Sequence, residues 1–166
     1  MKNILIISTL LFVTFFLSCC NNDDDKPIAE IDKLPPATQT GANTFGCLLD
    51  GKAFLPGNYP NATNCFYQLV DGEYYFSFQM NNSNQDDNIV LVGINTNQLE
   101  ISAGGTYALA GIFTTTNGSV YTGELHITKL DTVNYIVSGT FWFDIEDFQG
   151  NIHHITEGRF DSQYTN

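Results

Sequence analysis

Two adjacent histidines, His153 and His154, lie close in the sequence to Asp144 and to an acidic run that ends at Asp147. A hairpin with a four-residue loop at 147–150 would place Asp144 opposite His153. An imidazole beside a carboxylate can begin a metal site or act as an acid–base pair. Successive strand residues point to opposite faces, so the two histidines cannot bind one ion without a bulge. We therefore expect a surface ion pair and no metal, and a hydrolase site around Asp144 and His153 is the alternative.

The single tryptophan, Trp142, is flanked by Phe141 and Phe143. In a strand, this arrangement puts an aromatic side chain on each face. It is typical of a central strand that is covered on both sides, and the alternative is an exposed platform on which a sugar ring stacks. Trp142, Asp144 and His153 are therefore the candidates for a ligand site. The sequence has no serine elbow, phosphate-binding glycine loop or His-Glu-x-x-His pattern, so its motifs predict no enzyme and no cofactor.

Two of the four cysteines, Cys47 and Cys65, fall within predicted strands. A turn at the Asp-Gly pair 71–72 would place Cys65 opposite Phe78 on an apolar face, and Cys47 alternates in step with apolar neighbours. In an oxidising compartment, a disulfide between them would close a loop of about 19 residues and stabilise the fold by roughly 3 kcal/mol. We predict this disulfide, and two buried free thiols are the alternative.

The elements that must position these residues are β-strands. From residue 44 onward, short runs of Phe, Tyr, Val, Ile and Thr alternate with Gly, Asn and Asp, and the Asp-Gly pairs at 50–51 and 71–72 are hairpin signals. The pattern predicts about nine to ten short strands in an all-β fold, with a single domain at 44–166. Uneven strand lengths and long loops favour an antiparallel β-sandwich over the alternative, a lipocalin-like closed barrel.

The N-terminus has the features of an export signal. Lys2 precedes an uncharged apolar run at 4–17, and the small Ser18 is followed by Cys19 and Cys20. The run is shorter than the roughly 20 residues that a membrane-spanning helix needs, so it suits a cleaved segment. A cysteine at the cleavage point resembles a bacterial lipoprotein signal. That resemblance implies acylation of Cys19, with Cys20 as the alternative.

This interpretation divides the chain into a signal peptide at 1–18, an acidic and proline-rich tether at 19–43, and the β domain. The formal net charge of the chain is −12 at pH 7. Such a balance repels phosphate backbones and anionic lipid surfaces, so we exclude nucleic acid as a partner. The attached lipid, rather than surface charge, is then expected to hold the protein at the membrane.

Several strings carry a family resemblance. They are residues 34–41 (Leu-Pro-Pro-Ala-Thr-Gln-Thr-Gly), 43–47, 50–52, 138–143 (Ser-Gly-Thr-Phe-Trp-Phe) and 155–161 (Ile-Thr-Glu-Gly-Arg-Phe-Asp). Together they resemble a family of small Bacteroidetes-type envelope lipoproteins of unassigned function, over roughly residues 34–161. The resemblance implies a β-rich fold at the outer membrane and supplies no catalytic residues. The Asn/Asp run after the acylated cysteine is similar to signals that send such lipoproteins to the cell surface.

Thr132 lies in a predicted turn, within the string Asp131-Thr132-Val133. The string resembles the Asp-Thr-aliphatic acceptor at which proteins of such envelopes receive O-linked glycan, and a polar loop tip can carry a bulky sugar. The alternative is an Asp–Thr pair that closes the turn through its own side chains.

Taken together, these features predict a surface-exposed, outer-membrane lipoprotein with a non-catalytic β-rich module of unknown ligand. The expected partner is the membrane, reached through the N-terminal lipid. Two alternatives are an envelope hydrolase around Asp144 and His153, and an accessory subunit of an outer-membrane complex.

Overall fold

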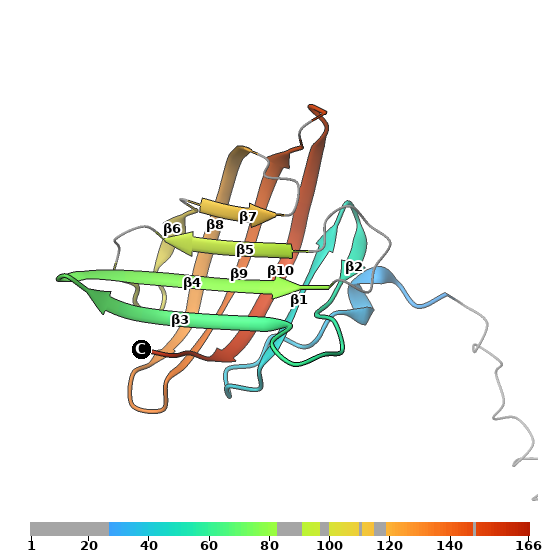
Figure 1. Ribbon diagram of the computed structural model, residues 1–166. Coiled ribbons are helices and arrows are strands. Elements are labelled where there is room, and N and C mark those ends of the chain that lie inside the picture. The colour runs from blue at the N-terminus through green and yellow to red at the C-terminus, as the bar shows by residue number, and fades with distance from the viewer. Residues whose placement is uncertain (1–26, 83–90, 97–99, 110, 115–118, 148) are drawn as a thin grey trace, which may run out of the picture.

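The computed structural model describes residues 27–82, 91–96, 100–109, 111–114, 119–147 and 149–166. These residues form two antiparallel sheets that do not close into a barrel, which confirms the predicted all-β sandwich. Figure 1 shows the smaller sheet lying in front of the larger one, with the strands of the two layers crossing steeply. In the described part of the chain, helical structure is limited to one short 3₁₀ helix, η2 (Glu30–Lys33).

The larger sheet has six strands in the order β2-β1-β10-β9-β8-β6, and the smaller has four in the order β3-β4-β5-β7. The strands of the larger sheet are β1 (Thr44–Leu49), β2 (Lys52–Phe54), β6 (Thr106–Ala108), β8 (Ser119–Asp131), β9 (Ile136–Glu146) and β10 (Ile152–Gln163). The strands of the smaller sheet are β3 (Thr63–Val70), β4 (Glu73–Asn81), β5 (Leu91–Thr96) and β7 (Gly111–Thr114).

Both Asp-Gly pairs form tight hairpin turns. Asp50 and Gly51 have φ angles of 49° and 79°, and Asp71 and Gly72 have φ angles of 52° and 87°. Two successive left-handed residues are what a type I′ turn requires, and Asp and Gly tolerate that conformation. The second turn aligns β3 with β4 so that Cys65 lies opposite Phe78, as the sequence predicts.

The core lies between the sheets and is rich in phenylalanine. Phe78 of β4 stacks on Phe45 of β1, with ring centroids 4.9 Å apart and planes within 5°. Phe78 also contacts Phe160 of β10 at 5.2 Å, and Phe45 contacts Phe141 of β9 at 5.4 Å. The two contacts of Phe78 join one layer to the other, and the Phe45–Phe141 contact continues the cluster within the larger sheet, so this aromatic packing holds the sandwich together.

Cys47 and Cys65 are buried free thiols, so the predicted disulfide is wrong in this structure. Burial raises the pKa of Cys47 to about 12, and burial also raises the pKa of Cys65, against a hydrogen bond with Ser162 that lowers it. Asp161 pairs with Thr44, so Ser162 lies beyond that end of β1, whereas Cys47 lies three residues further in. Three strand residues span about 10 Å, so the side chain that Cys65 contacts lies at least about that far along the sheet from Cys47.

The chain before β1 is docked on the domain rather than free. The carboxylate of Glu30 accepts a hydrogen bond from the backbone N–H of Ala53 at 2.8 Å, and Leu34 is buried. The expected tether at 19–43 is therefore wrong for residues from about 30 onward, which belong to the folded unit. Composition misses this docking because the segment buries little apolar surface and is held mainly by polar contacts.

The strongest of those polar contacts converge on Asp161, whose side chain is 1% exposed. Its carboxylate accepts hydrogen bonds from the Thr38 hydroxyl at 2.6 Å, the Gly41 N–H at 2.8 Å and the Ser138 hydroxyl at 2.7 Å. Burial raises the pKa of Asp161, but these hydrogen bonds and others from Thr40 outweigh burial and hold it well below its ordinary value. An ionised carboxylate therefore fastens residues 38–42 to β10.

The predicted signal peptide and both acylation candidates, Cys19 and Cys20, lie outside the described residues. Among the residues that are described, there is no helix with the length and apolar character needed to cross a membrane.

Thr132 is exposed in the turn between β8 and β9, as expected. The carboxylate of Asp131 accepts hydrogen bonds from the backbone N–H groups of Val133 and Asn134 at 3.1 and 2.9 Å. Asp131 thus closes the turn through its side chain, and O-glycosylation of Thr132 stays a prediction.

Candidate functional site

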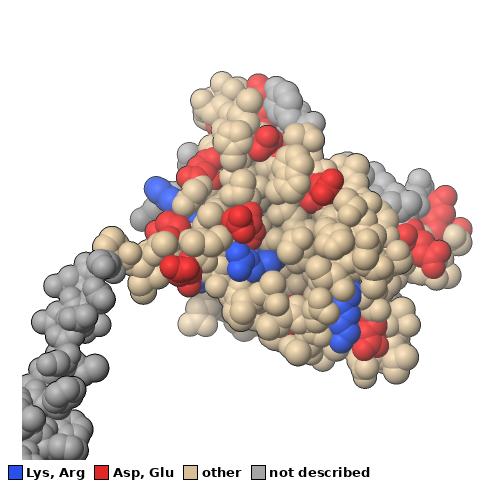
Figure 2. All heavy atoms as spheres, turned by 180° about the vertical axis from the view of Figure 1, so that it is seen from behind, with Lys and Arg blue, Asp and Glu red and all other residues tan. Residues whose placement is uncertain are grey.

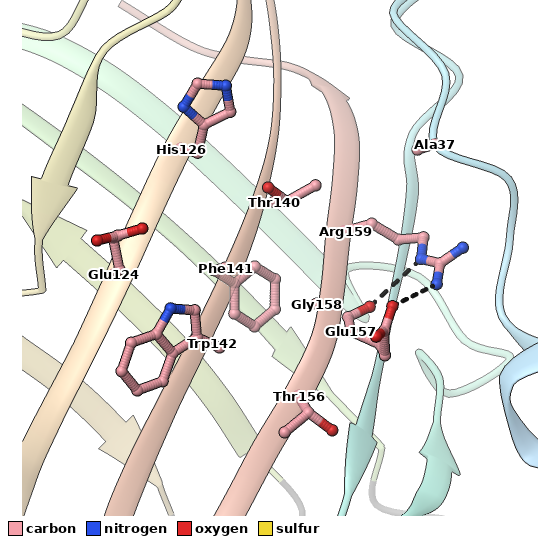
Figure 3. Close-up of a pocket in the computed structure, with 10 residues that line it drawn as sticks. All are labelled: Ala37, Glu124, His126, Thr140, Phe141, Trp142, Thr156, Glu157, Gly158 and Arg159. Atoms are coloured by element: carbon pink, nitrogen blue, oxygen red, sulfur yellow. Dashed lines mark hydrogen bonds and ion pairs between the residues drawn. The ribbon is translucent and has the colours of Figure 1, made fainter.

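A groove of about 620 Å³ crosses the outer face of the six-stranded sheet (Figure 3). The side chains that line it come from β8, β9 and β10, and Ala37 of the docked N-terminal segment lies at one end. Figure 2 looks onto this side of the molecule and shows a mostly uncharged surface with scattered acidic side chains and few basic ones.

Trp142 lies in the middle of the groove because only one face of β9 packs against the core. Phe141 and Phe143 are 3% and 0% exposed and point into the sandwich, whereas Trp142 between them is 42% exposed. The interpretation of β9 as a strand covered on both sides is therefore wrong, and the alternative of an outward-facing aromatic platform describes the geometry. The β-pleat alone produces this outcome once one face is buried.

Polar side chains flank Trp142 on the neighbouring strand β8. Glu124 lies directly opposite Trp142, and His126 lies opposite Thr140. The His126 ring is held by the Thr106 hydroxyl, 3.1 Å from Nδ1. Glu124 is exposed, and its side chain makes no hydrogen bond or ion pair with the described part of the chain. Its carboxylate is therefore available to a ligand beside the indole (Figure 3).

On the other side of Trp142, β10 carries a bulge. Phe143 pairs with Ile155 and Phe141 with Gly158, so two residues, Thr156 and Glu157, face the single residue Trp142. Glu157 has a φ of 54°, a left-handed conformation that costs roughly 1–2 kcal/mol for a residue with a side chain. Bulges re-aim side chains, and strain of this kind gathers at functional sites.

The bulge brings Glu157 and Arg159 together at the groove. The Arg159 Nε–H donates to the carbonyl of Glu157 at 3.3 Å, and its Nη2 lies 3.5 Å from the Glu157 carboxylate. Nη1 also lies 3.5 Å from the carbonyl of Pro35, which links the guanidinium to the docked N-terminal segment. The side chain of Arg159 is only 20% exposed. Its donors are therefore held in place rather than swinging freely in solvent.

Gly158 allows β10 to approach β9 at this point. A Cβ on Gly158 would lie 2.5 Å from both the carbonyl oxygen and the ring of Phe141. Such contacts are far inside van der Waals distance, so a larger residue would push the two strands apart beneath Trp142. The groove floor therefore depends on glycine here.

The histidines that the sequence singled out lie outside this groove, and their strand pairs with β9 in a different register from the predicted one. Asp144 pairs with His154, not with His153, and their side chains are 2.7 Å apart. The expected pairing of Asp144 with His153 is wrong because the hairpin loop has five residues, 147–151, instead of four. The extra residue is accommodated because the Asp147 carboxylate accepts backbone hydrogen bonds from within the loop.

His153 instead joins two loops. Its Nδ1 lies 2.7 Å from the carboxylate of Asp50 in the β1–β2 turn, and its Nε2 lies 3.4 Å from Asp147. Both ring nitrogens are thus engaged. Within the described ranges, no three His, Cys, Asp or Glu side chains gather as metal ligands would. The cluster is a structural clasp between two turns.

We expect this clasp to make stability depend on pH. The hydrogen bond with Asp50 is the main cause that raises the pKa of His153, against burial, which lowers it. A raised pKa means that the stabilisation is complete below the ordinary value of about 6.5 and is lost as pH rises through the folded value. The free energy of unfolding should therefore fall from about pH 6 to about pH 8, by under about 1 kcal/mol for a partly exposed pair.

Urea unfolding at these two pH values measures the effect. His153→Gln should reduce the pH dependence, whereas His154→Gln, at a more exposed imidazole, serves as the matched control. A His153→Gln variant with the same pH dependence as the wild type would contradict the assignment.

Of the three ligand-site candidates from the sequence, Trp142 lies in the groove, and Asp144 and His153 do not line it. Sequence reasoning missed its polar neighbours, Glu124, His126, Thr140, Thr156, Glu157 and Arg159. The alternation of apolar and polar residues along each strand indicates that these polar side chains point outward. Their convergence around Trp142 depends on the pairing of β8, β9 and β10, which alternation alone does not give.

Comparisons with family models, with curated proteins and with solved structures give no match to this chain.

Proposed function

We propose that this protein is a lipid-anchored envelope protein, displayed at the outer membrane, whose groove on the six-stranded sheet binds a ligand without chemical conversion. The N-terminal sequence pattern supports the location, with Cys19 or Cys20 as the acylated residue. The observation that carries the binding function is Trp142, a large aromatic side chain that faces solvent in a hollow surrounded by polar groups. Exposed aromatic surface in a concave, polar-rimmed site is typical of a binding site.

The arrangement supports binding rather than hydrolysis. A carboxyl group that acts as a general acid near neutral pH usually lies in a buried, apolar setting, whereas Glu124 and Glu157 are both exposed in an open groove. Glu157 is further engaged by Arg159. The imidazole–carboxylate pairs of the alternative hydrolase, at His153 and His154, hold turns and strands together away from Trp142.

The single tryptophan gives a direct test, because all tryptophan emission of the chain reports on the groove. We expect a ligand that binds the purified, detergent-solubilised protein to shift that emission and to protect Trp142 from acrylamide quenching. Trp142→Ala should weaken binding, measured by calorimetry, by about tenfold, which corresponds to about 1.4 kcal/mol of lost stacking.

Tyr135→Ala is the matched control, because Tyr135 is 45% exposed but belongs to the β8–β9 turn and not to the groove. It should bind as the wild type does. A ligand whose affinity survives Trp142→Ala, and whose binding leaves tryptophan emission unchanged, would place the binding site elsewhere and refute the proposal.

A further inference from the structure

We infer that the ligand of this groove is a neutral oligosaccharide that lies across strands β8, β9 and β10. The inference rests on the proposed function and adds the chemical class of the ligand. Trp142 would stack on the apolar face of one sugar ring. Glu124 on one side, and Arg159 with the adjacent hydroxyls on the other, would bind the sugar hydroxyls.

The shape of the groove fits a chain more than a single compact molecule. Glu124 on β8 and the bulge on β10 lie on either side of Trp142, and two strand spacings separate them by about 10 Å. This span is longer than one sugar ring, and the indole lies at its centre (Figure 3). A ligand that reaches both sides of Trp142 therefore extends across the strands.

The polar groups around the indole include both donors and acceptors. Glu124 offers two carboxylate oxygens with no partner among the described residues, and the guanidinium of Arg159 and the indole N–H offer donors. Thr140 and Thr156 add hydroxyl groups, which both donate and accept. Sugar hydroxyls also do both, and the C–H face of a sugar ring matches an aromatic surface. This mixed set around one indole is complementary to a sugar.

Other ligand classes fit the same groups less well. A polyanion would meet two carboxylates in the groove and a chain whose net charge is −12. A polycation could pair with Glu124. Glu157, however, is already paired with Arg159, and the positive charge of Arg159 would repel a cationic ligand. A wholly apolar ligand would remove water from these charged and polar side chains without replacing their hydrogen bonds. An uncharged, hydroxyl-rich ligand avoids all three penalties.

The bulge on β10 explains how Arg159 is held in position to donate hydrogen bonds before a ligand binds. Arg159 is fixed by the carbonyl and carboxylate of Glu157 and approaches the carbonyl of Pro35, so little side-chain freedom remains to be lost on binding. Pro35 lies three residues before Thr38, where the Asp161 carboxylate begins to fasten the chain, so the docked N-terminal residues help to position this side of the groove.

The test titrates the detergent-solubilised protein with maltohexaose, cellohexaose, mannohexaose, xylohexaose, hexagalacturonate and hexalysine, and follows tryptophan emission and heat. We expect at least one of the neutral sugars to bind and to shift the emission. We expect no comparable response to hexagalacturonate or hexalysine, and little change in the neutral sugar's affinity between low and high salt.

Paired variants at Glu124 separate hydrogen bonding from charge. Glu124→Ala should weaken binding of the neutral sugar about threefold to tenfold, as expected for one lost hydrogen bond. Glu124→Gln, which keeps an acceptor and removes the charge, should stay within about threefold of the wild type. A cationic ligand would instead lose affinity with both variants and with added salt.

The outcomes distinguish this inference from the proposed function. Binding of hexalysine or hexagalacturonate with a shift in Trp142 emission, and no neutral sugar bound, would overturn the ligand class and leave the groove as a binding site. A neutral sugar that binds without affecting Trp142 would overturn both. Failure of every neutral sugar to bind would also overturn the inference.

Discussion

Asp161→Ala is expected to lower the free energy of unfolding by about 3–5 kcal/mol, because several donors lose their acceptor and each buried donor left unpaired costs about 1–3 kcal/mol. The Asp161 carboxylate accepts six hydrogen bonds, from Thr38, Thr40, Gly41, Ala42 and Ser138. Without it, several donors on the docked segment and on β9 lose their acceptor. Urea unfolding measures the loss. Limited proteolysis should also cut residues 38–42 faster in the variant, because their attachment to β10 is gone.

The same carboxylate should control stability in acid. Because hydrogen bonds depress the folded pKa of Asp161 below the ordinary value of about 3.9, its contribution is complete above that value and is lost as pH falls through the folded pKa. The wild type should therefore lose stability as the pH falls below about 4, and Asp161→Asn should lose less over that range. Asp71→Asn, which removes the same charge at an exposed turn, is the matched control. Equal acid dependence in Asp161→Asn and wild type would contradict this account.

Phe78→Ala should cost about 3–5 kcal/mol of unfolding free energy, as for other buried phenylalanines cut back to alanine. Phe78 is 1% exposed and is the residue of β4 that contacts both Phe45 and Phe160 in the opposite sheet. Its loss removes contacts between the two layers and leaves a cavity that the crossed sheets cannot easily fill. Chemical unfolding with circular dichroism gives the measurement.

Leu69→Ala is the control for the Phe78 prediction. Leu69 lies in β3 of the same hairpin but is 59% exposed, so its truncation should change stability by less than about 0.5 kcal/mol. A Phe78→Ala variant that is no less stable than Leu69→Ala would show that the aromatic cluster does not hold the layers together.

The hairpins and the all-β fold could be predicted from the sequence because their causes are local. An Asp-Gly pair between two apolar runs favours two successive left-handed residues, both pairs in this chain adopt them, and the turn at Asp71 then fixes the pairing of Cys65 with Phe78. The loop at 147–151 was less predictable, because the Asp147 side chain accommodates one more residue than a four-residue loop. One residue of difference moved the cross-strand partner of Asp144 from His153 to His154, because each residue added to a hairpin loop shifts the pairing by one.

The candidate site could be predicted only in part. The aromatic residues at 141–143 indicated that β9 presents a ring on each side, but not which side would be covered. Glu124 and Glu157 are far apart in the sequence, and they flank Trp142 only because β8, β9 and β10 are neighbours in one sheet. The groove also depends on the bulge at Glu157, which neither the turn residues nor the alternation of the sequence predicted.

The sequence by itself therefore determined the strands, their tight turns and the apolar alternation that makes a sandwich, because each depends on neighbours a few residues apart. Tertiary structure alone decided three matters: that Trp142 faces solvent in a groove, that Cys47 and Cys65 are buried free thiols, and that residues 38–42 are fastened to Asp161. Each of these depends on contacts between distant segments. Such contacts follow from how whole sheets pack and align, which local propensity does not encode.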